Sequence, residues 1–352
     1  MSAEAFIDLD LITAIRVIML GFVGGVLSGF IGIGGAFFMT PGMMNLGIPG
    51  VIAVGSNLAQ RFGKAMMGSG KHRELGHVDR KLGLFMLVSA LIGIRLAVWF
   101  NTSLYEADNG AANAGAASDL YISAIYVVVL LAVAIGMLRD VGSSEGKGPS
   151  TRLAEFFSHI RIPPVVYFPT ADIRVSFWLV FAVGLFTGFL AGAIGAGGFV
   201  GVPAMIYAFG VPTVVAAGTQ LFLAIFMAAG GAIAYAWDGM VDLRLTVLLL
   251  FGSLSGVYFG TYGTRILKER TMRLITGLII LLCVVSRSFE VPVYLSRLEF
   301  WQLSANTESA LSWISHAILY TGGIAGMAII LGAVLRSYKR RRAVQDLMRT
   351  GQ

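Results

Sequence analysis

Charged residues are scarce in this sequence. Only 13% of its 352 residues are Asp, Glu, Lys or Arg, whereas a soluble domain carries about 25%. Apolar residues make up 57%, and the mean hydropathy is +0.80. A chain with so little polar surface needs lipid around most of it. We therefore predict an all-α membrane protein with many spans.

Other absences narrow the chemistry. The single cysteine, Cys283, lies in an apolar run, which excludes an internal disulfide. The sequence has no His/Cys/Asp/Glu cluster with metal-ligand spacing and no nucleophile motif. We therefore expect no metal, no cofactor, no catalytic residue and no enzyme activity. The net charge of +7 comes from cations between apolar runs, so we expect no nucleic-acid partner.

Nine apolar runs are long enough to cross about 30 Å of hydrocarbon, which takes roughly 20 residues. They lie near residues 11–31, 51–70, 82–100, 119–139, 174–194, 213–236, 243–263, 271–287 and 312–335. Two shorter pieces, 36–47 and 199–210, follow Gly-rich breaks and end at Gly-x-Pro. Because these pieces are too short to cross squarely, we predict that they are broken or re-entrant helices.

Lysine and arginine set the predicted orientation, because basic loops stay in the cytoplasm. They collect in 71–81, 139–174, 265–273 and the tail, and are absent from 101–118. This pattern predicts a multi-pass protein of the inner membrane with its amino terminus outside and its carboxyl terminus in the cytoplasm. The stretch before the first run has no Lys or Arg, unlike a secretory signal peptide, so we expect a mature first helix.

An internal repeat emerges when the sequence is shifted by 163 residues. Residues 21–93 then align without a gap on 184–256, and 23 of the 73 positions are identical. The matches include glycine, proline and aspartate, which do not align by chance in Leu- and Ala-rich segments. We predict a first membrane repeat (1–140), a cytoplasmic linker (141–173), a second repeat (174–290), and an extra transmembrane helix with a basic cytoplasmic tail (291–352).

The second repeat is predicted to be inverted. Loop 71–81 is basic, whereas its counterpart 234–244 holds one arginine and two aspartates, so the two loops are expected on opposite sides. Asp79 and Asp242 follow a Gly-x-Val turn, where we expect N-caps, with proton transfer as the alternative. Within the linker, 151–164 has the pattern of a short amphipathic helix, with a plain connector as the alternative.

Two dense glycine clusters are predicted to break helices. They are Gly32, Gly34 and Gly35 in the first repeat and Gly195, Gly197 and Gly198 in the second. Each glycine weakens a helix by about 1 kcal/mol relative to alanine. A broken helix exposes N–H groups and a positive dipole end, which together bind anions. The glycines spaced four apart before each cluster are predicted to serve helix packing instead.

The run 51–70 carries two cations inside the membrane and no acid. The candidate substrate ligands are Arg61, Lys64, Ser56, Asn57 and Gln60 in the first repeat, Thr219 and Gln220 in the second, and the six clustered glycines. Because a guanidinium donates a forked pair of hydrogen bonds to an oxyanion, we predict a small-anion site with Arg61 as its main ligand. The alternatives are that Arg61 lines a cavity or pairs with an acid elsewhere, and that Lys64 reaches the headgroups.

The chain resembles the TauE/SafE sulfite exporter family, also called sulfite or organosulfonate permeases. Over residues 15–287 the resemblance is carried by a twofold Gly-rich element (GFIGIGGAFFMTPG and GFLAGAIGAGGFVGVP), by the helix starts AVGSNL and AAGTQL, and by the turns GHVD and GMVD. It implies transport of a small sulfur-containing anion, such as sulfite or a sulfonate, coupled to the proton gradient. The linker, the ninth span and the Arg61/Lys64 pair depart from the family pattern.

We therefore expect a secondary transporter whose partners are a small anion and the lipid bilayer. Two alternatives stay open, namely a permease for another anion or a metal cation, and a non-transport intramembrane enzyme or sensor subunit. The lack of acids inside the predicted spans disfavours a metal cation. The lack of a catalytic dyad or an appended soluble domain disfavours an enzyme or sensor. The sequence predicts no oligomeric state.

Overall fold

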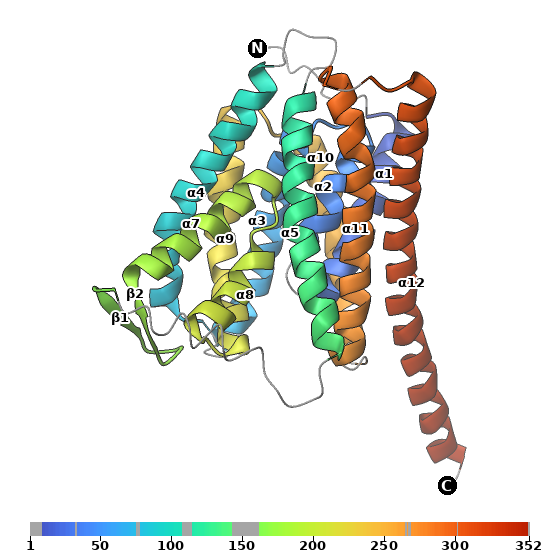
Figure 1. Ribbon diagram of the computed structural model, residues 1–352. Helices are drawn as coiled ribbons and strands as arrows, with labels where there is room; N and C mark the ends of the chain where they lie inside the picture. The colour runs from blue at the N-terminus through green and yellow to red at the C-terminus, as the bar shows by residue number, and fades with distance from the viewer. Residues whose placement is uncertain are drawn as a thin grey trace.

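Helices make up almost all of the protein (Figure 1). The computed structural model describes residues 9–31, 34–74, 78–107, 115–142, 162–264, 266, 269–300 and 302–350. The first five helices are α1 (Leu11–Ile31), α2 (Ala36–Asn45), α3 (Gly50–Glu74), α4 (Arg80–Ala107) and α5 (Ala116–Gly142). The later helices are α7 (Phe177–Ile194), α8 (Gly198–Phe209), α9 (Thr213–Trp237), α10 (Leu243–Thr264), α11 (Glu269–Arg297) and α12 (Ala305–Thr350).

Eight of the described helices are long and apolar enough to cross a membrane. This confirms a polytopic all-α membrane protein. The remaining predicted span, 51–70, corresponds to α3, which has 25 residues but is less apolar than the others because Arg61 and Lys64 interrupt it and its last turn is charged. The short helices α2 and α8 have 10 and 12 residues, so the two broken elements were placed correctly.

The structure corrects two predictions. Helix α11 continues to Arg297, ten residues beyond the predicted end of its span at 287. A small antiparallel hairpin, β1 (Val165–Phe168) and β2 (Ile173–Ser176), lies across the end of the predicted linker and the start of the predicted span 174–194, where no strand was predicted. The hairpin is anchored on Asp79, whose Oδ2 accepts hydrogen bonds from the N–H groups of Thr170 and Ala171. Most of the proposed amphipathic stretch 151–164 lies outside the described residues.

The two repeats are inverted in space. Helices α3 and α9 occupy equivalent places in the 163-residue shift and lie against each other. A Cβ on Gly231 would be 2.8 Å from Leu58, and a Cβ on Gly55 would be 3.0 Å from the Cβ of Tyr235. Earlier residues of α3 thus meet later residues of α9, so the equivalent helices run antiparallel. An antiparallel pair of equivalent helices is the geometry of an inverted repeat.

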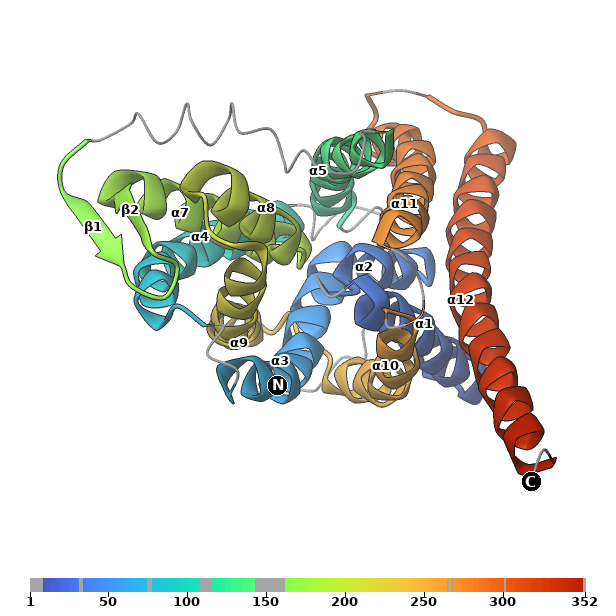
Figure 2. The ribbon, with the colours of Figure 1, turned by 90° about the horizontal axis from the view of Figure 1, so that it is seen from below.

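One helix of each repeat packs against a helix of the other repeat (Figure 2). Helix α10 of the second repeat packs along α1, and α4 of the first packs along α7. The contacts are backbone to backbone, because a Cβ on Gly25 would be 2.4 Å from the Ser253 carbonyl oxygen and one on the equivalent Gly188 would be 2.0 Å from that of Ala90. The glycines spaced four apart therefore serve close packing, as predicted.

The helix caps at Asp79 and Asp242 also link the repeats. The Asp79 N–H donates to Thr219 Oγ1 and the Asp242 N–H donates to Ser56 Oγ, each at 3.0 Å. Each carboxylate then accepts the N–H three residues on, which is an N-cap. Burial raises the pKa of Asp242, but hydrogen bonds from Arg244 outweigh this and leave its pKa lowered. The carboxylate is therefore ionised at neutral pH, as a cap requires.

We expect Ser56→Ala and Thr219→Val each to lower the free energy of unfolding by about 2 kcal/mol, because each leaves a buried N–H without its acceptor. Unfolding of the detergent-solubilised protein, followed by circular dichroism, measures the change. Ser255→Ala is the matched control, since that exposed hydroxyl donates only to the carbonyl of Phe251 in its own helix. Equal stabilities for all three variants would contradict the assigned links.

Candidate functional site

The candidate site lies where α3 and α9 cross. A small cavity of about 10 Å³ opens there, which is room for roughly one water molecule. Its lining residues are Leu58 and Arg61 from α3, Ala191 from α7, and Gln220, Ala224, Met227 and Ala228 from α9. Arg61 and Ala224 occupy equivalent positions of the two repeats. The cavity therefore lies on the axis that relates the repeats.

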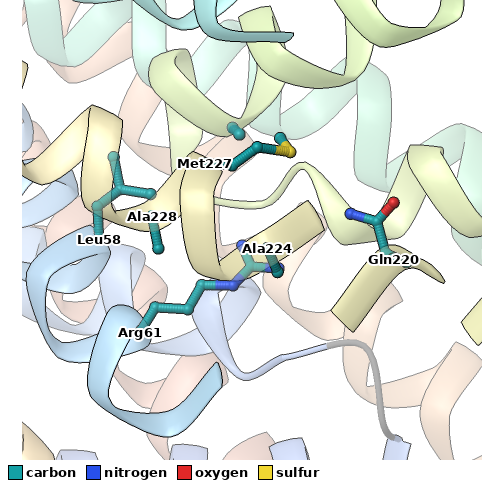
Figure 3. Close-up of a pocket in the computed structure, with 7 residues that line it drawn as sticks. Leu58, Arg61, Gln220, Ala224, Met227 and Ala228 are labelled. Carbon is teal, nitrogen blue, oxygen red and sulfur yellow. The ribbon is translucent and has the colours of Figure 1, made fainter. Parts of the chain in front are cut away.

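Arg61 reaches both helix breaks at once. Its Nη1 donates to the carbonyl oxygen of Gly195 at 2.6 Å. A Cβ on Gly34 would lie 3.5 Å from its Cζ, Nε and Nη2 atoms. Figure 3 shows the side chain extending from α3 to Ala224, with Gln220 further along α9. Arginines at both equivalent positions, 61 and 224, would compete for the same space. Because residue 224 is the small alanine, the Arg61 side chain fits there.

Glycines with positive φ angles lie at both breaks. Gly34 has φ +100 and Gly195 has φ +74, a region that residues with a Cβ rarely adopt. Helix α7 ends at Ile194, and α8 begins at Gly198. Arg61 binds the last turn of α7, where the negative end of the helix dipole favours a cation. Each break is followed by the start of a short helix, α2 after Gly34 and α8 after Gly195, whose first N–H groups are potential donors.

Two amide side chains complete the polar lining. Asn57 Nδ2 donates to Thr40 Oγ1 at 2.9 Å and lies beside Gly195. Gln220 is buried, and neither its Oε1 nor its Nε2 has a hydrogen-bond partner among the described residues. The buried Thr187 Oγ1 is also unpaired in the described part of the chain. Such groups are costly to leave unpaired, so they are suited to a ligand or an ordered water.

Other predicted ligands lie apart from this centre. The hydroxyls of Ser56 and Thr219 are engaged by the caps of the opposite repeat. Gln60 turns toward α10, where Nε2 donates to Ser253 Oγ at 3.0 Å, while its Oε1 is unpaired among the described residues. Lys64 is half-buried one turn from Arg61. These placements leave Arg61 and Asn57 beside the breaks and Gln220 in the lining of the cavity.

The clustered glycines divide in the same way. Gly35 and Gly197 serve packing, because a Cβ would lie 2.3 Å from the Gly24 carbonyl oxygen and 2.6 Å from the Cβ of Ala191, respectively. Gly198 is the first residue of α8. Gly32 lies outside the described residues. Gly34 and Gly195 are therefore the members that contact Arg61.

The positive charge of the site is not neutralised by an acid of the described residues. In that part of the chain the salt bridges are Arg95–Asp238, Arg244–Asp242 and His316–Glu290. Neither Arg61 nor Lys64 takes part in them. Two cations one helical turn apart thus leave a net positive charge at the crossing, which favours an anion.

A second polar cluster was missed at the sequence level. Arg287 is fully buried in α11, Glu290 lies one turn further, and Asp119 of α5 and His316 of α12 are near them. The expectation that the spans hold no acids was therefore wrong for Asp119 and Glu290. The signal was the Arg287/Glu290 pair at i, i+3 spacing, which is typical of one helix face. The hydropathy pattern ends the predicted span 271–287 before Glu290, so the pair was not recognised as lying within one helix.

Comparison with known proteins assigns the family. The model of the sulfite exporter TauE/SafE family matches residues 17–287. A probable membrane transporter protein of Bacillus subtilis strain 168, YjnA, is 26% identical over 273 residues, which cover 76% of this chain and 97% of the relative. A second from the same organism, YdhB, is 27% identical over 264 residues, covering 73% and 93%. No solved structure matches the chain significantly. With an inverted repeat, two broken helices and a match over most of its length, this chain is a multi-pass membrane transporter that belongs to the TauE/SafE family.

Proposed function

We propose that the protein is a secondary permease for a small oxyanion and that Arg61 is the main ligand of that anion. The observation that carries the proposal is the guanidinium at the crossing of α3 and α9, beside both helix breaks and outside every salt bridge of the described residues. The family description, sulfite exporter, points to a sulfur-containing anion such as sulfite or a sulfonate.

The chemistry of the site suits such an anion. A guanidinium has five N–H donors, and the bond to Gly195 uses one of them. The others provide a fork for two oxygen atoms of a sulfite or sulfonate group. The starts of α2 and α8 add backbone donors and positive dipole ends. The Gln220 amide offers a further donor from the opposite repeat.

The proposed orientation has the amino terminus outside and the carboxyl terminus in the cytoplasm of an inner-membrane protein. The basic residues of 71–81, 265–273 and the tail support it. The divisions at 140, 173 and 290 follow the same proposal, with the cytoplasmic linker 141–173 joining the two inverted repeats. Coupling to the proton gradient completes the proposed mechanism, because accumulation of an anion against its electrochemical gradient needs a driving ion.

The test is flux of labelled sulfite, sulfoacetate and related sulfonates in proteoliposomes. We expect Arg61→Ala to lower the flux of the transported anion about 10- to 100-fold, the loss that a charge-assisted forked hydrogen bond implies. Arg61→Lys should restore part of it, since an ammonium keeps the charge and loses the fork. Arg95→Ala is the control, because that side chain is 59% exposed.

The alternatives give different results. Undiminished flux of every transported anion in Arg61→Ala would remove Arg61 from the site. Wild-type flux of a metal cation and of no anion would favour a cation permease. A wild-type protein that moves none of these solutes would favour the enzyme or sensor alternative.

A further inference from the structure

The cluster of ionisable residues around Arg287 holds one end of the short helix α2. Arg287 Nη2 donates to Asn45 Oδ1, on the last residue of α2. His316 Nε2 lies 2.6 Å from the backbone carbonyl oxygen of the same residue. These two residues come from α11 and α12, which lie side by side in Figure 1. The C-terminal end of α2 is therefore fixed by two side chains of the last two helices.

Both ring nitrogens of His316 face hydrogen-bond acceptors. Nε2 faces the Asn45 carbonyl oxygen, and Nδ1 faces the carbonyl oxygen of Ser312. Both partners are acceptors, whereas a neutral imidazole has a single N–H. Only the imidazolium donates at both nitrogens. The carboxylate of Glu290, which is 5% exposed, lies 3.9 Å from Nδ1 and supplies the opposite charge.

A protonated His316 has an acidic partner in this cluster. Its Nδ1 faces the carboxylate of Glu290, and Arg287 and Asp119 lie near that pair. The titratable or charged groups around His316 are Arg287, Glu290, Tyr294 and Arg297 on α11, Asp119 on α5, Glu308 and Tyr320 on α12, and Arg16 on α1. Helix α2 carries no titratable side chain. Loss of the His316 proton removes the positive charge that faces the Glu290 carboxylate.

We propose that His316, with Glu290, is a proton-binding site that clamps the C-terminal end of α2 when the imidazole is protonated. The proton leaves from Nε2, because Nδ1 lies beside the Glu290 carboxylate and keeps its own. The Nε2 lone pair then faces the Asn45 carbonyl oxygen, and the clamp opens. Binding of the proton forms one N–H bond on the imidazole ring and breaks no other bond in the protein. The side chain of His316 is 32% exposed, which gives the proton access.

Helix α2 connects this proton site to the anion site. Its 10 residues span about 15 Å. At its start, Gly34 lies against Arg61, and in its middle Thr40 accepts a hydrogen bond from Asn57. A helix held at its C-terminal end by both Arg287 and His316 moves less than one held there by Arg287 alone. Proton occupancy at His316 therefore sets the freedom of the element that carries one of the two helix breaks.

The proton site lies beyond the family match. That match ends at residue 287, so neither Glu290 nor His316 is included in it. The site joins α12, which follows the second repeat, to α2 of the first. The inference goes beyond the proposed anion transport, and its structural part does not depend on it.

Thiol labelling at Leu46, the half-buried residue after α2, tests the clamp. The background is Leu46→Cys with Cys283→Ala, which removes the one native cysteine. In this background the maleimide labelling rate is compared at pH 5.5 and 8.5. His316→Gln, which does not titrate, shares the same thiol chemistry and corrects for thiolate formation.

At pH 5.5 we expect labelling in the His316 protein to be about tenfold slower than in His316→Gln, the change that loss of one charge-assisted hydrogen bond corresponds to. The two rates should converge at pH 8.5. His316→Arg, which stays charged and donates to both carbonyls, should be slow at both pH values relative to His316→Gln. If His316→Gln does not fold, the His316 protein and His316→Arg are compared directly, and their rates should diverge at pH 8.5 alone.

Equal labelling of all folded variants across this range would overturn the clamp. Because labelling requires no transported solute, it reads the clamp even where the Arg61 flux test fails. Flux then tests the coupling. The anion flux of the wild type should change with pH, and that of His316→Gln and His316→Arg should not. An unaltered pH profile in both variants would separate the clamp from transport.

Discussion

Gly188→Ala is expected to lower the free energy of unfolding by about 3 kcal/mol, at the upper end for an overpacked core. The added methyl would lie 2.0 Å from the carbonyl oxygen of Ala90 and 2.5 Å from its Cα. Both atoms belong to the backbone of α4, so no side chain can rotate away. The α4–α7 pair must separate, and the apolar contacts around Gly188 are lost with it. Chemical unfolding of the solubilised protein measures the change.

The two repeats and a neutral glycine provide the controls. Gly25→Ala, the equivalent change on α1, should be similarly destabilising, because its Cβ would lie 2.4 Å from the carbonyl oxygen of Ser253. A Cβ on Gly136 in α5 would meet no atom of the described residues within 4 Å, its own helix backbone aside. Gly136→Ala should therefore be neutral or stabilise the helix by up to about 1 kcal/mol. Similar stabilities for Gly188→Ala and Gly136→Ala would show that the backbones do not meet at Gly188.

Arg287→Ala is expected to lower the free energy of unfolding by about 3–5 kcal/mol. The side chain is 0% exposed, and its loss leaves Asn45 Oδ1 without this donor and Glu290 without a nearby guanidinium. It also leaves a cavity the size of an arginine. Thermal unfolding of the purified protein measures the change in stability, and the anion flux assay is run on the same variant.

Arg95→Ala separates burial from charge. Its side chain is 59% exposed and pairs with Asp238 at 3.6 Å, so the change should stay within about 1 kcal/mol. We assign Arg287 a structural role. An Arg287→Ala protein with unchanged stability and no anion flux would contradict that assignment. Arg287 would then belong to the anion site, and its assignment as a structural residue would be wrong.

The helices and their duplication were predictable because both leave a signal in the sequence. A membrane span requires about 20 apolar residues, and α1 and α10 follow that rule closely. The repeat was visible because Gly25 and Gly188 each need a residue without a side chain at the same packing contact. The inversion followed from the loop charges, and the antiparallel α3 and α9 agree with it.

The composition of the site was only partly predictable. The isolated charge of Arg61 marked it as a candidate ligand, and the glycine pattern predicted the breaks. Their meeting could not be derived, because the contact between Arg61 and Gly195 joins residues 134 positions apart. Ser56 and Thr219 were predicted as ligands because they are polar and inside a span. Their partners are N–H groups of the opposite repeat, which no local pattern indicates.

The ionisable cluster escaped prediction for a different reason. A hydropathy pattern ends a span at its first charge, whereas α11 continues to Arg297 because buried partners satisfy Arg287. Those partners come from α2 and α12, which are distant in sequence. The hairpin at the end of the linker is likewise held by a tertiary contact, the two hydrogen bonds to Asp79.

The exchange of α4 and α10 has a consequence for biosynthesis. The glycine face of α1 finds its partner helix only after residue 264 has been synthesised, more than 200 residues after α1 itself. At roughly 5–20 residues per second, α1 waits on the order of 10–50 s in the membrane without that partner. The translocation machinery or lipid must cover its small-residue face during this interval. Truncation before α10 should therefore leave a first repeat that inserts and is then cleared by quality-control proteases.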